Sequence, residues 1–179
     1  MKKSIAVFFS GFGSNLEVFL QNKEQFKKVF AVGSNPKAYG WTRVKEHKVS
    51  HLLLPKPIEW PKLHEVLLQE SCDFIFLAGF MKILPSQFVE DWEGKLFNLH
   101  PSLLPKYKGL KAIEQAYQAG DDIGVSIHHV TAELDAGPLV DQQLAVQKED
   151  LGTLSLDQVK QRVHKLEHQM VTQWIQRFS

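Results

Sequence analysis

The sequence has few cysteines and no long apolar runs, two features that would assign a protein to a secreted or a membrane class. It contains one cysteine, Cys72, which excludes an internal disulfide and is expected to be a buried thiol. No stretch approaches the roughly 18 apolar residues that a membrane-spanning helix requires. The apolar run near the N-terminus is too short for a signal peptide. We therefore expect a cytoplasmic protein that makes no membrane contact.

An excess of charge of one sign is also missing. The 21 Lys and Arg residues nearly balance the 20 Asp and Glu residues, for a formal charge of +1, so nothing predicts a nucleic-acid partner. Apolar residues at 44% and charged residues at 23% are typical of folded globular proteins. A length of 179 residues suits one core. We predict a single domain over residues 1–179.

Short apolar segments alternate with amphipathic ones. The segments expected as strands are 4–9, 28–34, 50–54, 74–79, 95–100, 124–130 and 139–146. The segments expected as helices are 15–26, 41–47, 60–71, 85–92, 112–120 and 154–178. This alternation predicts an α/β fold, a Rossmann-like three-layer sandwich with a mostly parallel sheet and helices on both faces. Segments 4–9 and 74–79 are almost entirely apolar, which indicates central strands.

A glycine-containing turn, "SGFGSNL", follows the first expected strand. Gly11 and Gly13 allow a tight turn, and Ser14 and Asn15 stand where a helix N-cap is expected. Free N–H groups at a helix start favour an anion. The dinucleotide motif G-x-G-x-x-G fails at Leu16, and no P-loop lysine follows. We expect a phosphate monoester rather than NAD or ATP; the alternative is a turn that only caps a helix.

A polar pair lies at the end of the strand segment 95–100. Asn98 and His100 are two residues apart, so their side chains face the same side of a strand. An amide can donate to a developing oxyanion, and a histidine can donate or move a proton, which suits addition to a carbonyl group. Asp135, in the turn "ELDAGP", could keep that imidazole charged if the fold brings it close. The alternatives are turn-satisfying polar residues and a solvent-facing aspartate.

The other histidines give weaker signals. His128 and His129 are neighbours on an expected strand and face opposite sides, so they are not expected to bind one metal ion together. His128 is expected in the core or behind the site. His164 and His168 lie four residues apart on an expected helix, but "HKLEH" lacks the order H-E-x-x-H. We predict no metal site.

Several separated motifs, taken together, resemble the 10-formyltetrahydrofolate-dependent formyltransferases, and within them the group that formylates glycinamide ribonucleotide in purine synthesis. The matching segments are "SGFGSNL", "SNPKAYG", "LAGFMKIL", "NLHPSLLPKYKG", "GVSIHHVTAELDAGP" and "RVHKLEH". The resemblance implies the formyltransferase fold and an enzyme with 10-formyltetrahydrofolate as co-substrate. It also implies a ribonucleotide amine as the formyl acceptor. We expect a monomer or a homodimer.

The resemblance also implies roles for individual residues. Asn98 and His100 match the family's residues that hold the tetrahedral intermediate, and Asp135 matches the one that assists proton transfer. The implied acceptor-binding residues are Gly13, Ser14, Asn15, Pro101 and Glu167. The implied folate-binding residues are Met81, Lys82, Leu84 and Asn98. Lys62 is a candidate contact for a polyglutamate tail.

Three positions depart from the pattern of this group. Ile113 stands where a histidine is common, Ala132 where an acid is common, and His164 where Gln or Lys is common. These departures affect the acceptor more than the formyl chemistry. Two alternatives therefore stay open: a formyltransferase for another amine, such as an amino-sugar nucleotide, and a phosphate-ligand binding module without catalysis.

Overall fold

The structure, a computed structural model, describes residues 1–178 and contains a seven-stranded sheet. The strands are β1 (Ser4–Phe9), β2 (Lys28–Gly33), β3 (Ser50–Leu53), β4 (Phe74–Leu77), β5 (Leu96–His100), β6 (Ile123–His129) and β7 (Leu139–Val146). Their order in the sheet is β3-β2-β1-β4-β5-β6-β7. Strands β1 to β5 pair in parallel, whereas β6 and β7 pair antiparallel. The predicted mostly parallel sheet is confirmed, with β1 and β4 at its centre.

The helices are α1 (Ser14–Gln21), α2 (Gly40–His47), α3 (Trp60–Gln69), α4 (Ser86–Asp91), α5 (Ala112–Ala119) and α6 (Leu156–Phe178). Two short 3-10 helices among the described residues are Lys23–Gln25, between α1 and β2, and Lys148–Thr153, between β7 and α6. The first helix is shorter than predicted. It ends at Gln21 because the Asn22 side chain donates to the Val18 carbonyl at 2.8 Å, which satisfies an end carbonyl and replaces a further turn. The predicted domain ends at Ser179, which lies outside the described residues.

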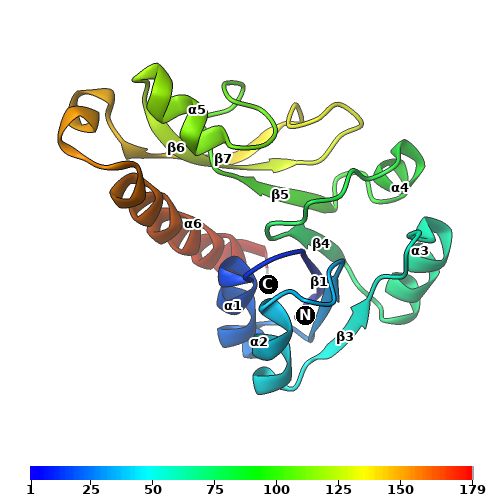
Figure 1. Cartoon of the computed structure of the whole chain (residues 1–179). Coiled ribbons are helices and arrows are strands. Elements are labelled where there is room, and N and C mark those ends of the chain that lie inside the picture. The colour runs from blue at the N-terminus through cyan, green and yellow to red at the C-terminus, as the bar shows by residue number, and fades with distance from the viewer. Residues whose placement is uncertain (179) are drawn as a thin grey trace.

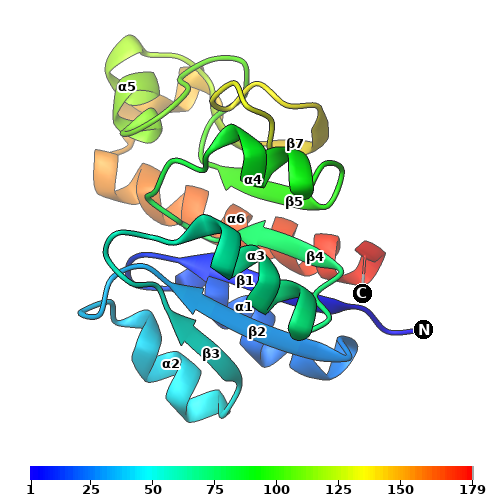
Figure 2. The same ribbon diagram turned by 90° about the vertical axis from the view of Figure 1, so that its right-hand side faces the viewer.

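The helices form two outer layers on the sheet (Figures 1 and 2). Helices α1, α2, α5 and α6 contribute to one apolar cluster on one face, and α3 and α4 contribute to a second cluster on the other. Alternate residues of the strands supply the two clusters, as a pleated strand requires. Val7 and Phe9 of β1 belong to the first cluster, while Ala6 and Phe8 belong to the second. The three-layer sandwich is therefore confirmed.

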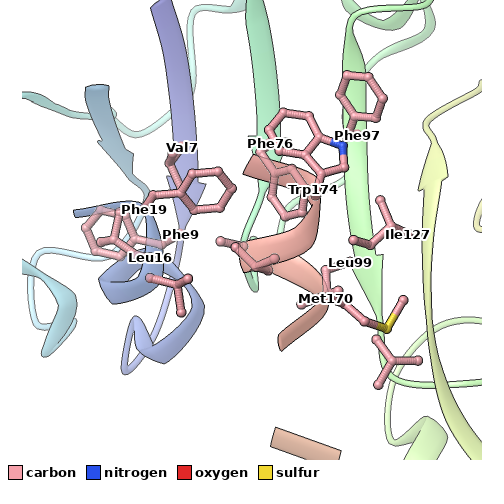
Figure 3. Packing of buried hydrophobic residues seen from close by; sticks show 14 of the residues in the cluster. Val7, Phe9, Leu16, Phe19, Phe76, Phe97, Leu99, Ile127, Met170 and Trp174 are labelled. Carbon is pink, nitrogen blue, oxygen red and sulfur yellow. The ribbon is translucent and has the colours of Figure 1, made fainter. Parts of the chain in front are cut away.

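The first cluster is rich in aromatic side chains, several of which contact helix α6 (Figure 3). Trp174 of α6 is 3% exposed and lies with its ring 5.0 Å from the rings of both Phe76 and Phe97. Edge-to-face contacts of this kind add to the burial of apolar area. The packing fixes α6 against β4 and β5. It therefore also fixes the polar side chains that α6 carries toward α1.

The second face is different over β5 and β6, where the residues after Leu96 on that face are polar or glycine. Two loops cover it, residues 101–111 after β5 and residues 130–138 after β6. Gly124 of β6 has no side chain, and a Cβ there would lie 2.4 Å from Leu103, so the first loop packs directly on the strand. Within residues 1–178, no helix is long and apolar enough to cross a membrane.

Candidate active site

The ends of three neighbouring strands bring the candidate residues to one part of the sheet. Asn98 pairs with Leu77 of β4 on one side and with His128 of β6 on the other. His100, two residues later, pairs with Ser126. Because cross-strand neighbours share a face, Asn98 and His128 present their side chains to the same space. This is the face that the two loops cover.

Asp135 reaches this space through the second loop. Strands β5 and β6 are antiparallel, so the loops that follow them start at opposite ends of the two strands. The loops meet across the face of the sheet. The Gly109 N–H donates to Asp135 Oδ2 at 2.8 Å, and Lys108 pairs with Glu133 at 3.0 Å. These contacts join the two loops. The fold therefore delivers Asp135 to the end of β5.

Asp135 contacts both members of the polar pair. Its Oδ1 accepts from Asn98 Nδ2 at 3.3 Å, and its Oδ2 lies 3.5 Å from His100 Nδ1. The structure thus brings together the three residues that the sequence singled out. We call Asn98, His100, Asp135 and His128 the β5 centre.

The donors of the β5 centre are engaged within the protein. His100 Nε2 lies 2.9 Å from the Tyr107 carbonyl, and His100 Nδ1 faces Asp135. A carbonyl and a carboxylate both accept, so only the doubly protonated imidazolium donates to both. The sequence predicted that Asn98 and His100 face one space. The structure adds that the covering loops supply acceptors to both side chains.

His128 is a member of the centre that sequence reasoning placed only in the core or behind the site. It is 1% exposed, and its Nδ1 lies 2.8 Å from the His129 carbonyl, so Nδ1 carries a proton. Its Nε2 lies 3.1 Å from Asn98 Nδ2 and 3.5 Å from Asp135 Oδ1. Nε2 accepts from the Asn98 amide when the ring is neutral and donates toward Asp135 when the ring is protonated. The signal in the sequence was only its place on a strand, whose pairing partner was unknown.

Asp135 is ionised at neutral pH. Burial alone would raise its pKa, but the His128 ring, the Gly109 N–H and the charge of protonated His100 outweigh burial and lower the pKa from 3.8 to about 2. Its backbone φ of 46° lies in the left-handed region, which aspartate tolerates better than most residues. The loop therefore holds a carboxylate that keeps its charge.

The glycine turn, residues 11–15, leads from β1 into α1. The prediction that Ser14 and Asn15 occupy the N-cap is wrong, because Gly13 is the cap and they are the first two helical residues. Gly13 has φ 75°, and a Cβ there would lie 2.9 Å from the Gly40 Cα. The first intrahelical bond runs from the Glu17 N–H to the Gly13 carbonyl. The N–H groups before it are left for an anion.

Glu167 of α6 joins this turn. Its Oε2 accepts from Asn15 Nδ2 at 3.2 Å and lies 2.9 Å from His164 Nδ1. The bond with Glu167 raises the pKa of His164 above 6.5, against the opposing effect of burial. Among the described residues, Asn15 Oδ1 is buried without a hydrogen-bond partner. This second group, the glycine turn with Glu167 and His164, is polar and less completely paired than the β5 centre.

Three of the four predicted folate-binding residues lie in the β4 loop, residues 78–85, and the fourth, Asn98, lies in β5. Met81 is 62% exposed, Lys82 is exposed, and Leu84 is half-buried against the second cluster. The loop begins beside Asn98, because Leu77 and Asn98 are register partners. Pro101 follows β5 directly and is half-buried. Lys62, the candidate contact for a polyglutamate tail, lies on the surface in the first turn of α3.

The three departures fall in different surroundings. Ile113 is 7% exposed and packs in the first cluster, so it belongs to the core. Ala132 is exposed on the second loop. His164 contacts a predicted site residue, Glu167. Across residues 1–178, no three His, Cys, Asp or Glu side chains are grouped so that they could hold a metal ion.

Comparison with known proteins gives consistent relatives. The formyl transferase family model matches residues 3–175. Phosphoribosylglycinamide formyltransferase of Bacillus subtilis is 34% identical over 93% of this chain and 89% of its own length. The human trifunctional purine biosynthetic protein adenosine-3 is 35% identical over 92% of this chain, which spans only 18% of that protein.

Solved structures agree with these relatives. A phosphoribosylglycinamide formyltransferase from Anaplasma phagocytophilum matches with a TM-score of 0.88 and 35% identity, over 98% of this chain and 86% of that one. The enzyme of the same name from Streptococcus pneumoniae matches with a TM-score of 0.88 and 32% identity, over 99% and 98% of the two chains. The resemblance inferred from the sequence motifs is confirmed, and the chain belongs to the formyl transferase family.

Proposed function

We propose that this protein transfers the formyl group of 10-formyltetrahydrofolate to the amine of glycinamide ribonucleotide, a step of purine biosynthesis. The observation that carries the proposal is the β5 centre, in which an amide, an imidazole and an ionised carboxylate meet at the end of one strand. The names of the relatives support formyl transfer and the acceptor. A single cytoplasmic domain, acting as a monomer or a homodimer, remains our prediction.

The chemistry needs an oxyanion donor and a route for one proton. When the acceptor amine adds to the formyl carbon, the carbonyl oxygen becomes an oxyanion, for which Asn98 Nδ2 and protonated His100 are the donors. The amine must lose a proton, and the departing folate nitrogen must gain one. Asp135 contacts His100 and assists that transfer.

The internal bonds of the centre indicate how the donors become available. The Asn98 to Asp135 contact at 3.3 Å and the His100 to Asp135 contact at 3.5 Å are long for hydrogen bonds to a charged group. Asn98 has a second acceptor in neutral His128 Nε2, which orients the amide when its bond to Asp135 is exchanged for a bond to substrate. A formyl oxygen would then accept the proton that Asn98 now shares with Asp135.

The two substrates would bind at the loops on either side of this centre. The glycine turn offers backbone N–H groups for the phosphate of the acceptor, and Glu167 offers an acceptor for ribose hydroxyls. Pro101 follows His100 and would form part of the floor under the acceptor. The β4 loop offers Met81 and Leu84 as apolar contacts for a pterin, with Lys82 beside them.

Steady-state turnover with defined acceptors tests the proposal. The protein is mixed with 10-formyltetrahydrofolate and, in separate reactions, glycinamide ribonucleotide, an amino-sugar nucleotide or glycinamide alone. We expect tetrahydrofolate release and a formylated product, identified by mass spectrometry, with glycinamide ribonucleotide. Turnover only with the amino-sugar nucleotide would change the acceptor, and ligand binding without turnover for any amine would identify a binding module instead.

A further inference from the structure

Ser10 lies between the two loops that the proposed function assigns to the two substrates. It follows β1 directly, precedes the glycine turn and is 9% exposed. Its N–H donates to the Gly79 carbonyl at 3.1 Å, and its Oγ lies 2.8 Å from the Met81 nitrogen. One residue thus makes both a backbone and a side-chain contact with the β4 loop.

The direction of the side-chain bond is fixed by the chemistry of its members. The Met81 backbone N–H can only donate, so Ser10 Oγ is the acceptor. Ser10 keeps its own hydroxyl proton, which can be given to Ser34 Oγ at 2.7 Å. Ser34 is 4% exposed and follows β2. The chain of contacts therefore runs from Ser34 through Ser10 to the backbone of Met81.

The β4 loop has few other means of fixing that stretch of backbone. Phe80 packs on Phe8 with ring centroids 5.2 Å apart, which anchors the start of the loop. Beyond it, Met81 is 62% exposed and Ile83 is 87% exposed, so their side chains contribute little packing. A backbone segment that lacks buried side chains depends on its hydrogen bonds for its position.

We propose that Ser10 is a positioning residue for the folate substrate, because its hydroxyl holds the Met81 backbone at a fixed place beside the end of β1. This inference rests on the proposed function for the identity of the ligand. Without the hydroxyl, the Met81 N–H loses its acceptor. The backbone of Ser10 and the glycine turn keep their own contacts, since the Ser10 N–H still binds Gly79 and the Gly40 N–H still binds Gly11.

The test compares Ser10→Ala with Ser34→Ala. Both substitutions remove one hydroxyl from the same buried pair, but only Ser10→Ala removes the acceptor of Met81. We expect Ser10→Ala to raise the KM for 10-formyltetrahydrofolate about threefold to tenfold, the range for one hydrogen bond, with the KM for the ribonucleotide changed less than about twofold. Ser34→Ala should stay within about twofold of the unmodified protein for both substrates.

Hydrogen exchange at the Met81 amide supplies a readout that does not depend on activity. We expect faster exchange of this amide in Ser10→Ala and unchanged exchange in Ser34→Ala. Equal effects of the two substitutions on folate KM, or an unchanged Met81 exchange rate in Ser10→Ala, would overturn the inference. If the unmodified protein shows no turnover, the proposed function fails. Titration of folate binding and the exchange rates then still decide the role of Ser10.

Discussion

The β5 centre and the glycine turn differ in how completely their polar groups are hydrogen-bonded within the protein. In the β5 centre, Asn98 and His100 both have partners within the protein, and two loops cover them. At the glycine turn, Asn15 Oδ1 has no partner among residues 1–178, and the first N–H groups of α1 precede the first helical bond. The N–H groups can therefore receive an anion and the Asn15 oxygen can accept from a hydroxyl, whereas the centre must exchange internal bonds for bonds to substrate.

Loss of the Asn98 amide should have the largest effect, and it should act on kcat rather than on binding. We expect Asn98→Ala to lower kcat about a hundredfold or more, because removal of one oxyanion donor costs that much in comparable sites. The KM for the ribonucleotide should change little, since the glycine turn is untouched. Rapid-quench kinetics with both substrates would measure the effect. A loss of affinity with full kcat would assign Asn98 to binding rather than to chemistry.

Alteration of the glycine turn should act on binding instead. Gly13→Ala places a Cβ 2.9 Å from the Gly40 Cα at a φ of 75°, so we expect a loss of about 1–2 kcal/mol in the free energy of unfolding. The displaced turn should raise the KM for the ribonucleotide about tenfold and leave the KM for folate nearly unchanged. Gly11→Ala is the matched control, because a Cβ there meets no atom of residues 1–178 within 4 Å. Equal effects of the two substitutions would refute the special role of Gly13.

The smallest expected effect is the pH dependence of the pair between His164 and Glu167. Glu167 raises the pKa of His164 above 6.5, so the stabilisation is fully present below pH 6.5 and is lost as the pH rises through the raised pKa. The His164 side chain is 55% exposed, so the effect should stay below about 1 kcal/mol. Urea unfolding at several pH values should show this loss in the unmodified protein but not in His164→Gln. An identical pH profile for both would contradict the pair's contribution.

The sequence predicted the strands well because their apolar runs are bounded by turns and polar residues. It also identified Asn98, His100 and Asp135 as candidates, since residue type and spacing carry that chemistry. It could not show that β6 runs antiparallel to β5, a long-range choice that places His128 beside Asn98. The N-cap was displaced by one residue because Gly13 approaches Gly40, a contact between segments distant in sequence.

The sequence could not show how the β5 centre is assembled. The residues after β5 and β6 read only as turns, and nothing local indicates that they meet across the sheet. Their contacts, such as Gly109 with Asp135 and Lys108 with Glu133, join segments more than twenty residues apart. The hydrogen bonds that hold Asn98 and His100 within the protein therefore depend on the fold and not on any local motif.

Asp135 is proposed to act through His100, which it contacts at 3.5 Å, and a double-mutant cycle on kcat measures whether the two residues depend on each other. His100→Gln, Asp135→Asn and the double variant are compared with the unmodified protein under saturating concentrations of both substrates. We expect the double variant to be only slightly slower than the slower single variant, because each substitution disables the same pair. Losses that multiply in the double variant would show that the two residues act independently and would rule out this pairing.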